Sequence, residues 1–334
     1  MFACLRYLRN VLRERFFFSR ALRAARREAL ASRARIAVFH DFAPPPTGGG
    51  HQFLRALISE WERMGISVVV NAWPDSAEVV LLNSYNFTPE LLRRVKKPGV
   101  RVVHRVDGPL QVYRGFDDGT DEEIARLNRE FASRTIFQSD FSRAENKRLQ
   151  FGLREGRVIL NAADREIFTP RSKTSPKTGR PIRVMAASWS DNPNKGLDVF
   201  QWIDAHLDPA RFQFTFVGRA QMNFEKAKHI EAVPSDELAR LLREHDVFLT
   251  ASMNDPCSNS VIEALTVGLP CVYRQSGGHP ELVKDAGVGF DSPEEIPEAL
   301  EKVARNWKSY VDKIQIPLIE EVAERYLEVL EVHR

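Results

Sequence analysis

One pattern recurs along most of the chain: a short apolar run, an abrupt change to polar residues or glycine, and then a stretch with helical spacing. Such runs lie at residues 36–40, 67–71, 77–82, 100–103 and 158–160, with another ending at 138, and again at 182–187, 212–218, 229–230, 247–251 and 269–273. Buried strands of parallel sheets read as continuous apolar runs, and parallel neighbours need a crossover that is usually helical. The pattern therefore predicts an α/β protein with two Rossmann-like, doubly wound sheets.

A segment rich in Lys, Ser, Pro and Gly, RSKTSPKTGRPIR, interrupts this pattern and indicates a domain boundary. We expect a basic N-terminal segment at residues 1–35, a first domain at 36–170, a linker at 171–182, a second domain at 183–316 and a further helix at 317–334. A length of 334 residues suits two domains, and 43% hydrophobic with 28% charged residues is ordinary for a globular protein.

The three cysteines, Cys4, Cys257 and Cys271, are widely separated and odd in number. This argues against a disulfide framework and favours a reducing compartment, so we expect a cytoplasmic protein. No cysteine or histidine spacing is typical of a zinc site, and Cys257 is expected to be a small packing residue.

The N-terminal segment is strongly basic. Residues 1–35 hold ten arginines against two glutamates, whereas the whole chain has a net charge of +3, so the rest is about five charges negative. Phenylalanines and leucines alternate with these arginines at near-helical spacing, which predicts that residues 1–30 lie on an anionic membrane surface at the inner face of the membrane. The alternative is a helix packed on the protein's own domain. Nucleic-acid binding is disfavoured because the rest of the chain lacks a basic groove, and arginines interrupt every apolar run that could form a signal peptide.

Two carboxylates stand eight positions apart, across the start of an expected helix. Asp255 lies in a turn, and Glu263 follows about one helical turn after the unpaired N–H groups of residues 258–260. Those N–H groups suit a phosphate, and the two carboxylates suit hydroxyl groups on either side of it. The layout predicts a nucleotide-diphosphate sugar as ligand.

This segment, with GLP at 268–270 and GGHPELV at 277–283, resembles the E-x7-E signature of family-4 retaining glycosyltransferases, here with aspartate first. The resemblance implies a GT-B fold, with two Rossmann-like domains facing across a cleft and a final helix that crosses back to the first domain. It also implies that Glu263 binds the ribose, that Asp255 contacts the donor sugar, and that Gly277 and Gly278 let the backbone approach the ligand. In the alternative interpretation, Asp255 caps the helix and Glu263 is a solvated charge.

Other residues take their expected roles from the same resemblance. Lys195 would neutralise the diphosphate leaving group, together with the backbone N–H groups at the start of the helix. Ser190 stands where the family usually has an arginine, so Arg219 or Arg274 is expected to supply the missing charge. The donor-binding set that we expect comprises Gly49, Gly50, Lys195, Arg219, Ser258, Asn259, Ser260, Glu263, Gly277 and Gly278.

The glycine-rich loop at 48–50 has a position that matches the family, although a flexible turn is the alternative. The segment HRVDGP at 104–109 gathers His104, Arg105 and Asp107 where a strand gives way to a loop. Because side chains alternate along a strand, either His104 or the pair of Arg105 and Asp107 would face the cleft. We favour a catalytic role for Asp107; the alternative is a structural ion pair between Arg105 and Asp107, with His104 hydrogen-bonded in the core.

The segment NAADREIFTP resembles the element that closes the first domain in these enzymes, so Asn161 and Asp164 are expected near the cleft. No Asp-x-Asp cluster occurs in a matching loop, so we expect neither a metal nor another cofactor. Lys195 and the helix start would do the electrostatic work instead.

These features predict a retaining glycosyltransferase, with Asp107, Lys195 and Asp255 as catalytic residues. It would move a sugar from a nucleotide-diphosphate donor to a hydroxyl of a saccharide or lipid-linked acceptor, in polysaccharide or glycolipid synthesis. The alternatives are a nucleotide-sugar-binding protein without catalysis, and an epimerase or hydrolase on the same fold. A dinucleotide oxidoreductase is disfavoured because no G-x-G-x-x-G follows either first strand.

Overall fold

The computed structural model describes residues 32–43, 48–95, 99–170, 176, 179–190, 192–220 and 222–333. The predictions for the basic segment at residues 1–30, including its membrane contact, lie outside the described residues. Among the helices that the structure describes, none is long and apolar enough to cross a membrane.

The first sheet has six parallel strands in the order β2-β1-β3-β4-β5-β6. Its strands are β1 (Ile36–Phe39), β2 (Val68–Val70), β3 (Val79–Asn83), β4 (Arg101–Val106), β5 (Arg134–Phe137) and β6 (Gly156–Val158). The helices between them are α3 (Gly49–Arg63), α4 (Pro89–Val95), α5 (Leu110–Arg114), α6 (Thr120–Phe131) and α7 (Asp140–Arg148).

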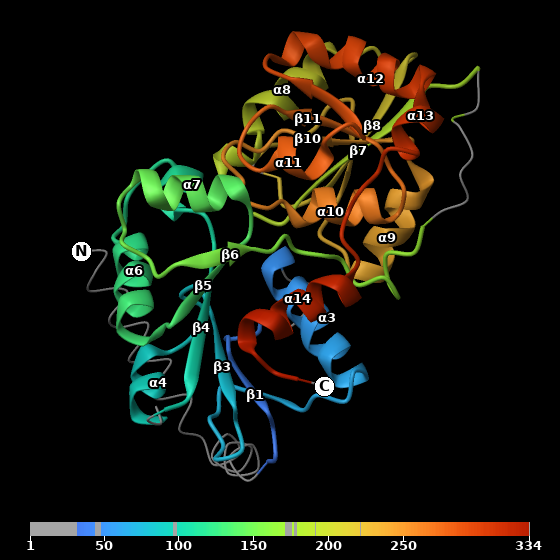
Figure 1. Ribbon diagram of the computed structural model, residues 1–334. Coiled ribbons are helices and arrows are strands. Elements are labelled where there is room, and N and C mark those ends of the chain that lie inside the picture. Colours follow the sequence, from blue (N-terminus) through green and yellow to red (C-terminus); the bar gives the residue numbers. More distant parts are fainter. Residues whose placement is uncertain are drawn as a thin grey trace.

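The second sheet also has six parallel strands, in the order β12-β11-β10-β7-β8-β9. Its strands are β7 (Ile182–Ser188), β8 (Phe212–Gly218), β9 (Lys228–Ile230), β10 (Val247–Thr250), β11 (Cys271–Arg274) and β12 (Gly287–Phe290). Its helices are α8 (Leu197–His206), α9 (Ser235–Glu244), α10 (Asn259–Thr266), α11 (His279–Val283), α12 (Ile296–Arg305) and α13 (Trp307–Val311), with short 3-10 turns η1 (Pro193–Lys195) and η2 (Pro293–Glu295). Figure 1 shows the two sheets in separate lobes, and the predicted doubly wound α/β architecture is confirmed.

Each sheet has a hydrophobic core on both faces. In the first lobe, one core joins β1 and β3 to α3 and the other contains Trp73 and Phe131. In the second lobe, α9, α10 and α11 cover one face, while α8 and α12 cover the other. Burial on both faces explains why these strands read as continuous apolar runs.

The helix α14 (Ile319–Leu330) follows the second lobe in the chain but packs on the first (Figure 1). It lies beside α3, where the indole Nε1 of Trp61 donates a hydrogen bond to the carbonyl of Ala323 at 3.2 Å. Tyr326 is fully buried between the rings of Phe53 and Trp61. The first core therefore contains side chains from both ends of the described chain.

Most strands begin or end one or two residues from their expected bounds. β4 runs on to Val106 because Arg105 pairs with both Asn83 of β3 and Ile136 of β5. β6 lies at 156–158, slightly before the expected 158–160. β12 was not expected at all, because its sequence GVGF contains two glycines, which are depleted in strands.

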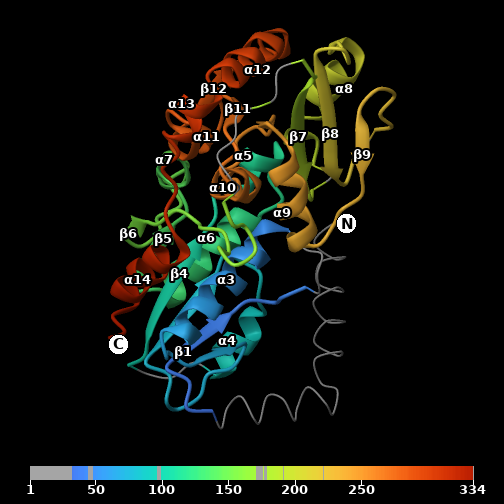
Figure 2. The same cartoon turned by 90° about the vertical axis from the view of Figure 1, so that its right-hand side faces the viewer.

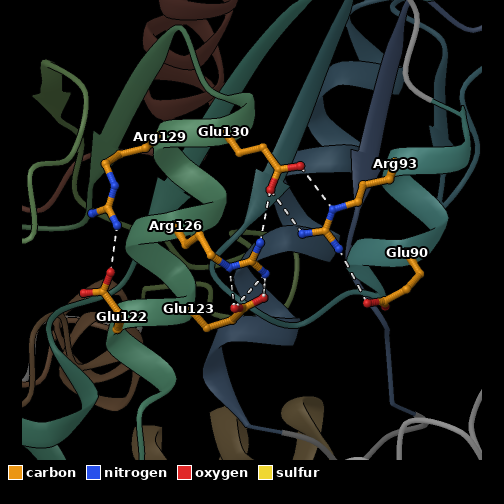
Figure 3. Close-up of polar contacts among 7 residues, drawn as sticks. All are labelled: Glu90, Arg93, Glu122, Glu123, Arg126, Arg129 and Glu130. Atoms are coloured by element: carbon orange, nitrogen blue, oxygen red, sulfur yellow. Dashed lines mark hydrogen bonds and ion pairs between the residues drawn. The ribbon is translucent and has the colours of Figure 1, made fainter.

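An ion-pair network joins α4 to α6 on the surface of the first lobe, as Figure 3 shows. Arg93 bonds Glu130, which also contacts Arg126, and further pairs extend along α6. Exposed pairs of this kind each stabilise a protein by about 0–1 kcal/mol. None of these residues lines the cavity described below.

Candidate active site

A cavity of about 310 Å³ lies where the carboxyl ends of the two sheets face each other. The first lobe contributes the loops after β1, β4 and β5, and the second contributes those after β7, β8, β9 and β10. Ligands of open α/β sheets bind at this edge of the strands. The position of the cavity is therefore that of an active or binding site.

Glycines let the two lobes meet beside the cavity. A Cβ atom on Gly49 would lie 2.4 Å from the Cβ of Asn259, and one on Gly108 would lie 2.7 Å from the Cβ of Pro256. The start of α3 therefore abuts the start of α10. Gly49 and Gly50 line the cavity as expected, and Gly49 is in addition a contact between the lobes.

Lys195 and Asp255 lie together in the cavity wall and form an ion pair, with 2.6 Å between Nζ and Oδ2. Asp255 is 5% exposed, and its Oδ1 accepts a hydrogen bond from the N–H of Cys257. Burial opposes ionisation of both groups, but their mutual attraction prevails, so the pKa of Lys195 is raised and that of Asp255 is lowered. The aromatic ring of Tyr113 lies 5.0 Å from the ammonium nitrogen. The pair is therefore charged, and the sequence did not reveal that its two members contact each other.

The lysine is fixed by its backbone surroundings. Gly196, directly after it, has a φ of +99°, and a Cβ there would lie 2.3 Å from the Cβ of Ala251. Only glycine fits this turn, which ends η1 and begins α8. The turn brings Lys195 to the loop that follows β10.

Glu263 is a cavity-wall carboxylate whose side chain has no polar partner in the part of the chain that the structure describes. It is 8% exposed, and no group among the described residues donates a hydrogen bond or forms an ion pair with its side chain. Burial raises its pKa to about 8. The interpretation of Glu263 as a solvated surface charge is wrong, because the side chain is buried and lines the cavity.

The start of α10 lies between the two acids. Ser258, Asn259 and Ser260 line the cavity, and Ser258 is the N-cap residue. The interpretation of Asp255 as the helix cap is therefore wrong. Because the first N–H groups of a helix have no acceptor within it, this terminus offers donors and a positive dipole end to an anion.

Asp107 also lines the cavity. The face of β4 that carries Arg105 is therefore the one turned to the cleft, and not the face that carries His104. Its Oδ1 accepts hydrogen bonds from Arg105, at 3.2 Å, and from Gln138. Arg105 is 1% exposed and lies beneath Asp107, where it also donates to Asn83 at 2.6 Å and to Asn161 at 2.9 Å. The structural ion pair of the alternative interpretation is thus present, although Asp107 also lines the cavity.

His104 does not lie at the cleft, contrary to one expectation. It is fully buried on the opposite face of β4, where its Nε2 donates to the carbonyl of Ser84 at 2.8 Å. Burial lowers its pKa to about 4, so it is neutral. Alternation along a strand defines two faces, but packing decides which of them reaches the cleft.

Asn161 and Asp164 lie close to the cavity without lining it. Asn161 is buried and donates to Gln138 and, across the lobes, to Asn259 at 3.1 Å. Asp164 lines a neighbouring cavity of about 160 Å³, which Glu263 also lines.

The arginines expected to replace the missing charge at Ser190 lie outside the main cavity. The guanidinium of Arg219 stacks on the ring of Trp189 at 4.6 Å, and Arg219 lines a small adjoining cavity together with Lys195. Arg274 instead pairs with Asp198 at 3.1 Å. Arg219 is therefore the nearer candidate, through its contact with a cavity-lining tryptophan.

Gly277 and Gly278 do not line the cavity either. Their close contacts are with backbone: a Cβ on Gly277 would lie 2.4 Å from the carbonyl oxygen of Asp255, and one on Gly278 would lie 2.5 Å from that of Pro256. They shape the loop that carries Asp255 rather than a surface for the ligand. From the sequence alone, a glycine that lets a ligand approach the backbone cannot be distinguished from one that lets two backbone segments approach each other.

Several cavity residues were missed from the sequence, among them Tyr113, Gln138 and Trp189. Gln138 and Trp189 directly follow β5 and β7, so their position at the sheet edge was the available signal, whereas Tyr113 lies within α5 and had no such signal. Among the described residues, no group of three or more His, Cys, Asp or Glu side chains is arranged to hold a metal ion.

Comparisons with known proteins concern the second lobe and the fold of the whole chain. Residues 180–306, most of the second lobe, match the family described as Glycosyl transferases group 1. A sequence comparison with curated proteins gives no match. The similarity to group 1 glycosyl transferases therefore lies in the second lobe.

The fold of the whole chain is similar to that of several solved structures. Sucrose-phosphate synthase from Thermosynechococcus elongatus aligns over 89% of this chain and 98% of its own, with 13% identity and a TM-score of 0.71. The Anabaena protein HepE in complex with UDP-glucose aligns over 89% of this chain and 100% of its own, with 16% identity and a TM-score of 0.64. The catalytic domain of starch synthase IV from Arabidopsis thaliana, bound to ADP and acarbose, aligns over 89% and 98%, with 11% identity and a TM-score of 0.64. These similarities show that the chain has the GT-B fold.

Proposed function

We propose that this protein is a retaining glycosyltransferase that uses a nucleotide-diphosphate sugar as donor. The observation that carries the proposal is the cavity wall, where a helix N-terminus and a fixed lysine lie together with a buried carboxylate that has no partner among the described residues. The group 1 domain supports sugar transfer, and similarly folded proteins were solved with UDP-glucose, UDP or ADP bound.

Each part of the donor has a matching group. The two oxygens of Glu263 accept hydrogen bonds from the ribose hydroxyls, which gives this buried carboxylate the donors that the described residues do not supply. The N–H groups at the start of α10 and the ammonium of Lys195 bind the diphosphate. The carboxylate of Asp255 orients Lys195, and its remaining lone pairs accept a hydrogen bond from a hydroxyl of the sugar.

The reaction breaks the bond between the anomeric carbon and the diphosphate oxygen. Negative charge develops on that oxygen, and Lys195 with the helix terminus stabilises it, which lowers the barrier without a metal ion. Among the described residues of the cavity wall, Asp255 is paired with Lys195, and Glu263 is assigned to the ribose in this proposal. Asp107 accepts hydrogen bonds from Arg105 and Gln138, so no carboxylate is left for the role of nucleophile. We therefore propose a front-face transfer, in which the departing phosphate takes the proton of the acceptor hydroxyl and Asp107 orients the reacting groups.

In this proposal, the acceptor binds to the first lobe. The basic segment at residues 1–30 suggests that this acceptor is lipid-linked or a surface polysaccharide, at the cytoplasmic face of a membrane. Flotation with anionic liposomes tests this part separately. Deletion of residues 1–30 should abolish flotation; unchanged membrane binding by the truncated protein would contradict the membrane role.

The enzymatic proposal is tested with a donor screen followed by turnover. Thermal shift with UDP-, GDP- and ADP-sugars should identify a base that raises the melting temperature of the wild type. Donor hydrolysis or transfer is then compared in the wild type, Lys195→Ala and Glu263→Ala. The matched controls are Lys308→Ala and Glu62→Gln, which change exposed residues that do not line the cavity.

Both site variants should lose at least about tenfold in kcat/KM, whereas the controls should keep the wild-type value. Equal turnover in the wild type and both site variants would contradict the proposal that the protein is an enzyme. Donor binding without any turnover would favour the alternative of a nucleotide-sugar-binding protein.

A further inference from the structure

The short helix α5 lies between the lobes, and each lobe satisfies one of its ends. At its start, the carboxylate of Asp121 in the first lobe accepts hydrogen bonds from the N–H groups of Leu110 and Gln111, at 2.8 and 2.9 Å. At its other end, the carbonyls of Val112 and Tyr113 accept hydrogen bonds from the second lobe. The last carbonyls of a helix have no donors within it and carry its negative dipole end. The two lobes together therefore supply hydrogen-bond partners to both ends of this helix.

Three asparagine side chains make the contacts from the second lobe. The Nδ2 atoms of Asn192 and Asn194 donate to the carbonyl of Tyr113 at 3.2 and 3.0 Å. The Nδ2 atom of Asn254 donates to the carbonyl of Val112 at 3.2 Å. All three residues belong to loops at the carboxyl edge of the second sheet.

Two of these asparagines directly precede the ion pair of the cavity. Asn194 comes before Lys195, and Asn254 comes before Asp255. The two loops are also joined to each other, because the N–H of Met253 donates to the carbonyl of Asn194 at 2.7 Å. The end of α5 therefore holds both members of the pair through the residue that adjoins each of them.

Tyr113 adds a contact to the lysine itself. Its ring lies 5.0 Å from the ammonium nitrogen, and the residue lines the cavity. A cation–π contact stabilises an ammonium without occupying a hydrogen-bond acceptor. The ammonium of Lys195 donates to Asp255 at 2.6 Å and also has a hydrogen bond with the side chain of Tyr113. An ammonium has three N–H groups, so one remains for an anionic ligand.

We propose that α5 is an interdomain latch that positions Lys195, so that the diphosphate-binding site is complete only when the two lobes are closed. The latch consists of the carbonyls of Val112 and Tyr113, the ring of Tyr113, and the amides of Asn192, Asn194 and Asn254. Tyr113 and the asparagines are thus positioning residues. The identity of the ligand as a nucleoside diphosphate rests on the proposed function.

The test compares Asn194→Ala, Asn254→Ala and the double variant with Asn306→Ala. Asn306 is a matched control, because its Nδ2 also donates to a helix carbonyl, that of Lys302 at 3.0 Å, but within one lobe. Calorimetric Kd values are measured for UDP and for uridine, or for the corresponding pair of the base that the donor screen selects. Uridine lacks the phosphates on which Lys195 acts.

The double variant should weaken UDP binding about tenfold and leave uridine binding within about twofold of the wild type, because two net hydrogen bonds that position the lysine are lost. Asn306→Ala should change neither constant. Equal weakening of UDP and uridine binding, or no weakening of UDP binding, would overturn the latch.

Variants of Tyr113 test the ring. Tyr113→Leu should weaken UDP binding by about fivefold to thirtyfold, and Tyr113→Phe, which keeps the ring, should restore most of the affinity. Equal affinities for the leucine variant and the wild type would overturn the role of the ring.

Hydrogen exchange separates the latch from the proposed function. If the wild type binds no nucleotide, the proposed function fails, but the latch still predicts faster exchange of amides 110–116 in the double variant than in Asn306→Ala. Unchanged exchange in this segment would overturn the latch independently of any ligand.

Discussion

Replacing Glu263 with glutamine should stabilise the ligand-free protein at alkaline pH while it damages donor binding. The carboxylate is buried, has no donor among the described residues, and has its pKa raised by burial from 4.5 to about 8. Glutamine has nearly the same shape and cannot ionise. The substitution therefore removes the desolvation of a charge and little else.

The structure sets the size and sign of this effect. Below about pH 4.5 the side chain of Glu263 is protonated in both the folded and the unfolded chain, so its ionisation does not change the free energy of unfolding. Between about 4.5 and 8 the folded state retains a proton that the unfolded state has lost, so the free energy of unfolding falls as the pH rises. The full difference, from 4.5 to about 8, corresponds to about 5 kcal/mol at most.

Urea unfolding of the wild type, Glu263→Gln and the exposed-site control Glu62→Gln between pH 5 and 9 measures this difference. The gap between Glu263→Gln and the wild type should widen steadily up to about pH 8 and then remain constant. The control should follow the wild type throughout. A gap that does not vary with pH would refute the reasoning that burial of this carboxylate is uncompensated.

Three further predictions concern the same site. Lys195→Met should lower the free energy of unfolding by about 3 kcal/mol in urea titrations, because it leaves Asp255 buried and unpaired, and the double change with Asp255→Asn should recover much of it; no recovery would contradict a charged pair. Gly49→Ala should lower the melting temperature through its clash across the cleft, whereas Gly50→Ala, where a Cβ meets nothing within 4 Å, should not; equal melting temperatures would argue against the close contact. Cys257 should not react with iodoacetamide at pH 8 until the protein unfolds, because burial raises its pKa to about 12, and rapid alkylation of the native protein, mapped by mass spectrometry, would contradict that burial.

Most of the fold could be predicted because its signals are local. A strand buried on both faces is an apolar run, and residues 212–218 were predicted with the observed bounds of β8. The strand β12 was not predicted, because its two glycines interrupt the apolar run that would indicate a strand. The side of β4 that faces the cleft could not be predicted, because alternation does not say where the neighbouring helices pack.

The candidate site was predictable where spacing alone fixes the geometry. Glu263 lies on the helix whose start was expected to bind phosphate, and both reach the cavity. The contacts of α5 with the second lobe could not be foreseen, because they join residues 79 to 142 positions apart and depend on how the lobes meet. The same holds for Arg105, whose partners come from three separate strand ends or loops.

The return of α14 to the first lobe has a consequence for synthesis on the ribosome. The hydrogen bond between Trp61 and Ala323 joins residues 262 positions apart, and Tyr326 fills the same core. Chains generally fold domain by domain as they emerge, the N-terminal domain first. Here the first lobe cannot complete its core until the whole second lobe has been translated, so its apolar face on α3 stays uncovered for that interval. A nascent chain stalled before residue 319 should therefore be a preferred client for chaperones, although all six strands of its first sheet have already emerged.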